Sequence, residues 1–207
     1  MSTPAEFWEE RYVSNGRVWS GRVNHTLAQV VGTLPEPPGR ALDLGCGEGG
    51  DAVWLAEQGW QVTAVDISPT AVSRGAAAAA ERGLASAITW LAHDLTTWRT
   101  EGSYDLVTAC FFQAPVELAR IDILRRAAGH LSPGGRLVVI SHAAPPPWAS
   151  PEHIGEHRFQ TPQEELAELE LGEGWAIDLA EVRMREITAP DGTPAMLDDG
   201  VLVVRRT

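Results

Sequence analysis

The chain has 207 residues, and its 28 acidic and 16 basic side chains give a formal net charge of −12 at pH 7. A surface this acidic repels nucleic acid and anionic membranes, so we expect neither as a partner. All sixteen basic residues are arginines. The absence of lysine excludes enzymes that form a Schiff base and nucleotide hydrolases that need a P-loop lysine.

Cysteine usage and the opening residues both predict a cytoplasmic protein. Cys46 and Cys110 are too few for a disulfide framework, and they fit no zinc-ligand spacing. Glu6, Glu9 and Glu10 occupy positions where a signal peptide would need an apolar core. No apolar run approaches the roughly 18 residues of a membrane span. We therefore expect neither a membrane anchor nor a metal ion.

Two helical patterns open the chain, over Pro4–Ser14 and Asn24–Leu34, and the breaker Pro35–Gly39 follows them. This opening piece differs in pattern from the rest of the chain. We expect one domain over residues 1–207, in which residues 1–38 form a helical lid and residues 39–207 form a Rossmann-like core.

From residue 40 onward, strand and helix patterns alternate. Helices are expected before Gly59, after the N-cap Ser68, from about Val116 to His130, and over Thr161–Leu171. The strand patterns are residues 41–44, Gln61–Asp66, Ile88–Ala92, Tyr104–Cys110 and Arg136–Ser141, the last behind the turn Ser132–Gly135. Such alternation predicts parallel strands.

The C-terminal region has a different pattern. Trp175–Ile187 and Ala195–Arg205 are long strand patterns joined across the turn Pro190–Gly192, which predicts an antiparallel hairpin. The predicted fold class is therefore α/β, a doubly wound, mainly parallel seven-stranded sheet with helices on both faces and a C-terminal antiparallel hairpin.

A glycine-rich loop, Gly45-Cys46-Gly47-Glu48-Gly49-Gly50, lies between the first core strand and the next helix. Glycines there allow a sharp turn and a close approach of the backbone to a ligand. The spacing of Gly45, Gly47 and Gly50 also matches a dinucleotide fingerprint, so the loop alone does not separate NAD from S-adenosylmethionine.

Aspartates mark the ends of three successive strands, at Asp43, Asp66 and Asp94. A carboxylate at Asp66 can accept hydrogen bonds from both ribose hydroxyls, and one at Asp94 can accept from the adenine amino group. We expect the three to converge with Gly47 on one hollow. Carboxylates there would repel a pyrophosphate but attract a sulfonium cation, which favours S-adenosyl-L-methionine.

The chain resembles the class I S-adenosylmethionine-dependent methyltransferases over about residues 40–141. Five motifs in the family's order carry the resemblance: Leu42–Gly49, Val65–Ser68, His93–Leu95, Tyr104–Val107 and Leu131–Gly135. The resemblance implies that the last strand, Ala195–Arg205, inserts antiparallel into the sheet. The opening motifs Phe7–Tyr12, Gly16 and Trp19 look like the thiopurine, thiol/halide and tellurite-resistance branch.

The resemblance also implies roles for individual residues. Trp8 and Tyr12 would flank the methionine end of the cofactor, and Trp19 would border the substrate. Cys110 and Phe111 would lie under the cofactor. The full set expected to bind the cofactor is Trp8, Tyr12, Gly45, Cys46, Gly47, Asp51, Asp66, Ile67, Ser68, Asp94, Leu95, Cys110 and Phe111.

The expected acceptor is a small molecule with a thiol, chalcogen or hydroxyl group. A thiolate needs no general base, whereas a hydroxyl does, and His142 after the fifth strand is the candidate base. Gln113 is the candidate for orienting the acceptor. The turn after Cys110 lacks the Asn/Asp-Pro-Pro-aromatic sequence expected of enzymes that methylate amino groups of nucleic acid bases.

Two other functions stay open at this stage: an NAD(P)-binding oxidoreductase, although no Tyr-x-x-x-Lys pair is possible, and a non-catalytic adenosyl-binding module. The stretch His153–His157 matches an inverted zinc-peptidase motif. Gly155 disfavours the helix that this motif needs, so we interpret the match as chance in a loop over the substrate. The sequence determines neither the acceptor nor the oligomeric state.

Overall fold

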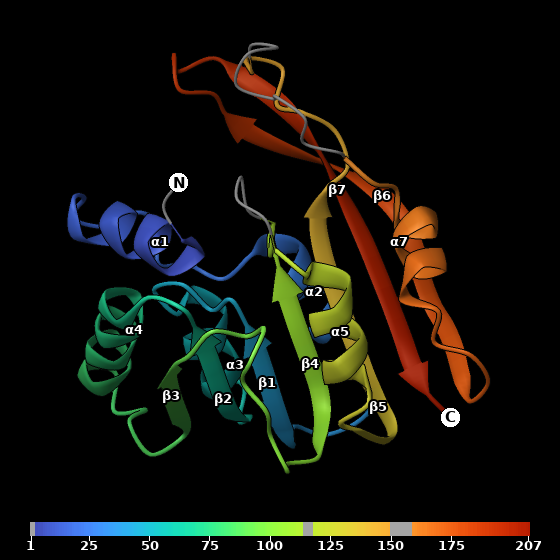
Figure 1. The fold of residues 1–207 in the computed structure, drawn as a ribbon. Coiled ribbons are helices and arrows are strands. Elements are labelled where there is room, and N and C mark those ends of the chain that lie inside the picture. The colour runs from blue at the N-terminus through green and yellow to red at the C-terminus, as the bar shows by residue number, and fades with distance from the viewer. Residues whose placement is uncertain (1–2, 114–117, 150–158) are drawn as a thin grey trace.

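A computed structural model describes residues 3–113, 118–149 and 159–207 of the chain (Figure 1). The helices are α1 Pro4–Val13, α2 His25–Val31, α3 Gly50–Glu57, α4 Pro69–Glu81, α5 Arg120–Ala128 and α7 Pro162–Leu169. The strands are β1 Arg40–Leu44, β2 Gln61–Asp66, β3 Ile88–Ala92, β4 Tyr104–Cys110, β5 Leu131–His142, β6 Trp175–Thr188 and β7 Pro194–Arg206.

The strands form a seven-stranded sheet in the order β3-β2-β1-β4-β5-β7-β6. The pairs from β3 to β5 are parallel, while β7 pairs antiparallel with both β5 and β6. The predicted fold class is confirmed, including the antiparallel insertion of the last strand. Parallel strands place their carboxyl ends on one edge, which is where ligands bind in such sheets.

The sheet separates two hydrophobic cores. Helices α2 and α3 cover one face, and α5 and α7 cover the other (Figure 1). Successive strand residues point to opposite faces: Ala41 of β1 packs in the first core and Leu42 in the second, as do Val138 and Leu137 of β5. Because both faces are covered, these strands are almost continuously apolar.

Helix caps explain where several helices begin. The side chain of Thr3 accepts a hydrogen bond from the backbone of Glu6, and Glu6 reciprocates, which makes a capping box at the start of α1. Ser68 caps α4 by accepting from the backbone of Ala71, as the sequence predicts. Thr161 caps α7 in the same way as Thr3 caps α1.

The largest differences from the predicted boundaries are in β5 and α5. Strand β5 begins at Leu131 and so includes Ser132–Gly135, predicted as a turn before the strand. Tyr104 pairs with Leu131 but Leu106 pairs with Arg136, so β5 carries extra residues in a bulge. Helix α5 begins at Arg120, and residues 114–117 lie outside the described part of the chain.

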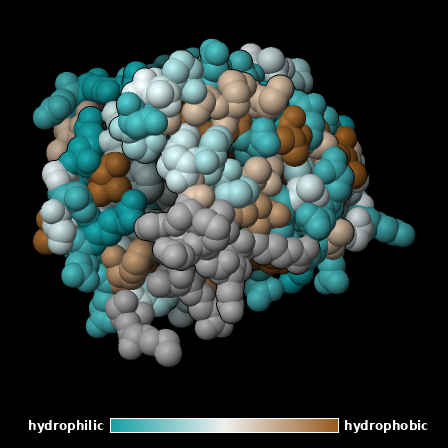
Figure 2. Space-filling view, turned by 90° about the horizontal axis from the view of Figure 1, so that it is seen from above, coloured by the Kyte–Doolittle hydropathy of each residue, from teal (hydrophilic) through white to brown (hydrophobic). Residues whose placement is uncertain are grey.

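The carboxyl edge of the parallel strands is flanked by α1 and by the far end of the β6–β7 hairpin (Figure 1). Seen from above, this side of the molecule is largely hydrophilic, with separate hydrophobic residues between the polar ones (Figure 2). Of the helices that the structure describes, none combines the length and apolar character needed to cross a bilayer.

Candidate active site

A cleft of about 1300 Å³ opens at the carboxyl edge of the sheet, between the N-terminal segment, the glycine loop and the β6–β7 hairpin. Every predicted site residue except Ser68 lines it. These residues are Trp8, Tyr12, Trp19, Gly45, Cys46, Gly47, Asp51, Asp66, Ile67, Asp94, Leu95, Cys110, Phe111, Gln113 and His142. The structure therefore brings together in one cavity residues that are spread over more than half of the sequence.

The glycine loop passes directly beneath aromatic side chains of the N-terminal segment. Gly47 has φ +52°, and a Cβ atom there would lie 3.0 Å from the Tyr12 hydroxyl and 3.3 Å from the Trp19 ring. The Trp19 Nε1 donates a hydrogen bond of 2.8 Å to the Tyr12 hydroxyl. A side chain at position 47 would be strained and crowded, so the close packing over this loop requires glycine.

Three carboxyl groups of the cleft carry raised pKa values. Burial, followed by the charge of Asp51, raises the pKa of Asp43 well above its usual value. Burial likewise raises the pKa values of Asp51 and Asp66, against the hydrogen bonds that they accept. A nearby cation would stabilise the ionised forms of all three groups.

The hydrogen bonds of Asp43 give the clearest support for a cation in the cleft. Its Oδ1 accepts a hydrogen bond of 2.8 Å from the Thr108 hydroxyl, while its buried Oδ2 has no partner among the described residues. Asp51 accepts a 2.6 Å bond from the backbone of Asn24. An unpartnered carboxylate oxygen facing a cleft fits a ligand that carries an ammonium or sulfonium group, as S-adenosylmethionine does.

Asp66 lies at the end of β2, next to the loop. Its oxygens accept hydrogen bonds from the backbone of Gly47 at 2.8 Å and of Ser68 at 2.9 Å. A carboxylate can accept about four hydrogen bonds, so capacity remains for ribose hydroxyls. The Ser68 side chain does not line the cleft: it is buried as the cap of α4 and donates to Glu9 at 2.6 Å.

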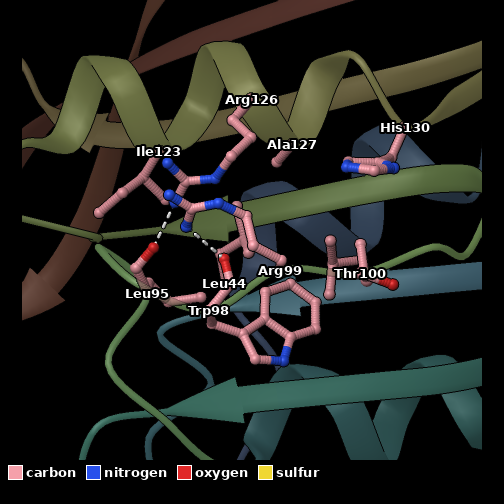
Figure 3. Close-up of a pocket in the computed structure, with 10 residues that line it drawn as sticks. Leu44, Leu95, Trp98, Arg99, Thr100, Ile123, Arg126, Ala127 and His130 are labelled. Carbon is pink, nitrogen blue, oxygen red and sulfur yellow. Dashed lines mark hydrogen bonds between the residues drawn. The ribbon is translucent and has the colours of Figure 1, made fainter.

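Helix α5 holds the backbone near Asp94 and Leu95, where the adenine of the cofactor is predicted to bind. The exposed Asp94 accepts hydrogen bonds from the backbone and hydroxyl of Thr96. Next to it, the carbonyl of Leu95 accepts a hydrogen bond from Arg126 of α5 (Figure 3). The guanidinium of Arg99 lies beside that of Arg126, and burial, followed by the charge of Arg99, lowers the pKa of Arg126. Helix α5 thus fixes the backbone at Leu95.

An ion pair between a buried glutamate and a partly exposed arginine ties the N-terminal segment to the glycine loop. Glu48 is 4% exposed and accepts hydrogen bonds from the backbone of Val18 at 3.0 Å and of Trp19 at 2.9 Å. Arg74 of α4 donates to Glu48 at 2.9 Å and to the carbonyls of Tyr12 and Asn15 at 3.0 and 2.9 Å. We call Glu48 and Arg74 the lid latch.

Helix α1 is also held against α4. Glu9 accepts hydrogen bonds from the hydroxyls of Ser68 at 2.6 Å and Thr70 at 2.5 Å, and these bonds lower the pKa of Glu9. Together with the lid latch, this contact places Trp8 and Tyr12 over the cleft. The N-terminal segment is therefore docked over the cavity in this structure.

The far end of the cleft contains the two predicted catalytic residues. His142, at the end of β5, stacks on Phe111 with 4.2 Å between ring centroids. The backbone N–H of His142 donates a 2.9 Å hydrogen bond to the side-chain oxygen of Gln113. Phe111 has φ +50°, an uncommon backbone for a bulky residue, which places its ring between β4 and His142.

Comparisons with known proteins agree with this geometry. A family model described as a methyltransferase domain matches residues 41–135. The probable thiol methyltransferase 2 of Arabidopsis thaliana is 33% identical over 135 residues, covering 64% of this chain and 60% of the relative. Residues 41–135 of the chain group with the class I S-adenosylmethionine-dependent methyltransferase domains.

Two further matches are a curated relative with a different substrate and a solved structure. Ribosomal RNA small subunit methyltransferase C of Alcanivorax borkumensis is 36% identical over 152 residues, covering 68% of this chain and 45% of the relative. The chain thus spans 45% to 60% of the length of these two curated relatives. The fold is similar to N-methyltransferase NodS from Bradyrhizobium japonicum, solved with S-adenosylhomocysteine, with a TM-score of 0.71, 19% identity and 99% coverage of each chain.

Sequence reasoning missed residues that line the cleft from the segment after α1, such as Arg22 and Asn24, and residues from the end of β6. Arg185, together with Ile187 and Thr188, lines the cleft from the end of β6. The turn Pro190–Gly192 sets the hairpin register, which pairs Arg185 with Leu197 and leaves Asp199 diagonal to Arg185. That register could have indicated the Arg185–Asp199 pair, but not that it faces the cleft.

Among the described residues, no group of three or more His, Cys, Asp and Glu side chains is placed to hold a metal ion. The zinc-peptidase-like stretch His153–His157 lies outside the described residues. So do residues 150–158 of the loop that was expected to cover the substrate.

Proposed function

We propose that this protein transfers a methyl group from S-adenosylmethionine to a small-molecule acceptor, and that the acceptor atom is a thiol sulfur. The observation that carries the proposal is the convergence of the glycine loop with the buried Asp43 and Asp66 and the partly buried Asp51, three carboxyl groups with raised pKa values. A cationic adenosyl ligand neutralises that cluster, whereas the pyrophosphate of NAD would add to its negative charge.

When bound, S-adenosylmethionine supplies an electrophilic methyl group. Asp66 and Asp94 would hold the adenosine half, and Asp43 and Asp51 would stabilise the charged methionine end. Trp8 and Tyr12 would cover the ligand and exclude water. Holding two reactants in line within a dry cavity can supply much of the rate, so the residues need mainly to position them.

The acceptor end favours a soft nucleophile. Phe111 and His142 form a stacked pair there, and burial, followed by the charge of Asp51, raises the pKa of the Cys110 thiol nearby, so this end of the cleft is partly shielded from water. Attack by a thiolate on a cation removes charge, which apolar surroundings promote without a general base. The match to a thiol methyltransferase supports the same acceptor class. For a hydroxyl acceptor, His142 would have to accept the proton.

A small acceptor also suits the covered cleft. The lid latch and Glu9 hold the N-terminal segment over the cavity, and the net charge of −12 disfavours a nucleic acid. The match to a ribosomal RNA methyltransferase makes RNA the alternative to test. Release of S-adenosylhomocysteine with RNA but not with thiols would overturn the proposed acceptor.

Calorimetry with S-adenosylhomocysteine and with NADH tests the cofactor. We expect binding of the first, and a preference for NADH would refute the proposal. Asp66→Ala should weaken S-adenosylhomocysteine binding about 10- to 100-fold, the effect of losing a charge-assisted hydrogen bond. Asp105→Ala is the matched control, because Asp105 also accepts a backbone hydrogen bond, from Arg40, but lies outside the cleft lining.

Turnover separates an enzyme from a non-catalytic adenosyl-binding module. Release of S-adenosylhomocysteine is measured with thiols, phenols, selenite and tellurite as acceptors. Methylation of thiols is the expected result. Tight cofactor binding without turnover across the whole panel would favour the binding module.

A further inference from the structure

Charge is divided between the two ends of the cleft. The carboxyl groups of Asp43, Asp51 and Asp66 lie at the ends of β1 and β2 and the start of α3, where the cofactor is expected. At the opposite end, beyond Phe111, the hairpin contributes the guanidinium of Arg185. A cation at the acceptor end has no use for binding a sulfonium, so its presence there needs a separate reason.

Arg185 is held firmly from behind. Its Nε and Nη2 donate hydrogen bonds of 2.7 and 3.3 Å to the two carboxylate oxygens of Asp199. Asp199 is completely buried, whereas the Arg185 side chain is 23% exposed. Two nitrogens of the guanidinium are thus turned towards the protein interior, and Nη1 has no hydrogen-bond partner among the described residues. Such a fixed guanidinium loses little entropy when it binds an anion.

The guanidinium also lies beside the residues expected to position the acceptor. Its central carbon is 5.8 Å from the centroid of the Phe111 ring, and Phe111 stacks on His142. The Nδ1 of His142 is 3.9 Å from the same Asp199 that holds Arg185. Arg185 therefore belongs to the acceptor end of the cleft by contact as well as by position.

We propose that Arg185 is a specificity-determining residue that binds an anionic group, such as a carboxylate, on the methyl acceptor. The acceptor class is then a small thiol that carries an acid group. This inference rests on the proposed function, because it assumes that the acceptor occupies the cleft beyond Phe111. Arginine donors match a carboxylate well, and a neutral acceptor would leave Nη1 without an anionic partner.

The test compares two thiols of nearly equal size, 3-mercaptopropionate and its neutral amide, 3-mercaptopropionamide. Each is titrated by calorimetry into the protein saturated with S-adenosylhomocysteine, so that binding is measured without turnover. We expect the wild type to bind the carboxylate at least about tenfold more tightly than the amide. Arg185→Gln should abolish that preference, change amide binding less than about twofold, and leave S-adenosylhomocysteine affinity unchanged.

Arg183→Gln is the matched control. Arg183 lies two residues away on the same strand and pairs with Glu181, but it does not line the cleft. Because Arg185→Gln leaves Asp199 buried without its cation, the double variant Arg185→Gln/Asp199→Asn removes both charges together. The double variant should show the same selective loss of carboxylate binding as the single one.

The inference is overturned if the wild type shows no preference for the carboxylate, or if Arg185→Gln weakens both thiols equally. Turnover assays with the same pair distinguish this result from failure of the proposed function. A carboxylate preference that depends on Arg185, without methylation of either thiol, would refute the thiol acceptor and leave the anion site standing. Methylation of both thiols with equal kcat/KM, unaffected by Arg185→Gln, would refute the anion site alone.

Discussion

Removing Arg74 tests whether the lid latch holds the N-terminal segment over the cleft. In Arg74→Met, the guanidinium that donates to Glu48 and to the carbonyls of Tyr12 and Asn15 is lost. The buried carboxylate of Glu48 keeps its bonds from the backbone of Val18 and Trp19 but loses its cation. We therefore expect the N-terminal segment to undock more often and cofactor binding to weaken.

The magnitude follows from burial. Losing one partner of a fully buried ion pair costs about 3–5 kcal/mol. Glu48 is buried, but the Arg74 side chain is 32% exposed, and the two backbone donors to Glu48 remain. We expect a loss of about 2 kcal/mol in the free energy of unfolding, which lowers Tm by about 4–8 °C for a domain of this size.

Arg82→Met is the matched control. Arg82 and Glu57 form an ion pair at 2.8 Å, close to the 2.9 Å of Arg74 and Glu48, but their side chains are 49% and 38% exposed. Such a surface pair contributes about 0–1 kcal/mol. Urea denaturation and calorimetry with S-adenosylhomocysteine measure both variants. If Arg74→Met costs no more stability than Arg82→Met and leaves cofactor affinity unchanged, the latch does not hold the lid.

Two further predictions concern the glycine positions and the acids. A Cβ atom at Gly49 (φ +81°) would lie 2.3 Å from the Trp90 ring, whereas one at Gly83 (φ +73°) meets nothing within 4 Å. We therefore expect Gly49→Ala to lower the free energy of unfolding, measured by urea denaturation, by at least about 2 kcal/mol. Gly83→Ala should lower it by about 1 kcal/mol. Equal losses in the two variants would contradict the packing argument. The pKa values of Asp43 and Asp51 are raised above 3.8, so these groups release protons as pH rises through the raised values. Ionisation lowers the stability of the cofactor-free protein and favours binding of a cation. The affinity ratio of S-adenosylmethionine to S-adenosylhomocysteine should therefore rise as pH increases through the raised pKa values, and it should rise less steeply in Asp43→Asn. A ratio independent of pH in calorimetry would show that these groups do not face the sulfonium.

Local patterns were enough to predict most of the fold. The strands β2, β3 and β4 begin and end where the apolar runs predict, because each run is bounded by residues that stop strand pairing. Ser68 caps α4 as predicted, since a serine before a proline satisfies free N–H groups locally. Strand β5 is the exception, because it begins earlier than the sequence predicts. Ser132–Gly135 has the local signature of a turn, but pairing with β4 draws it into the strand as a bulge.

Some residues of the cleft could likewise be predicted from sequence patterns, whereas others could not. Strand ends and glycines can be recognised in sequence, so the residues around the glycine loop could be predicted to share one cleft before the structure. The lid latch joins positions 26 apart, and the contact of Arg185 with Phe111 joins β6 to β4. Such contacts depend on how distant elements pack, and no local periodicity encodes them. The sequence by itself determined the sheet, the glycine loop and its acids, whereas only the tertiary structure decided what closes the cleft and which charge faces the acceptor.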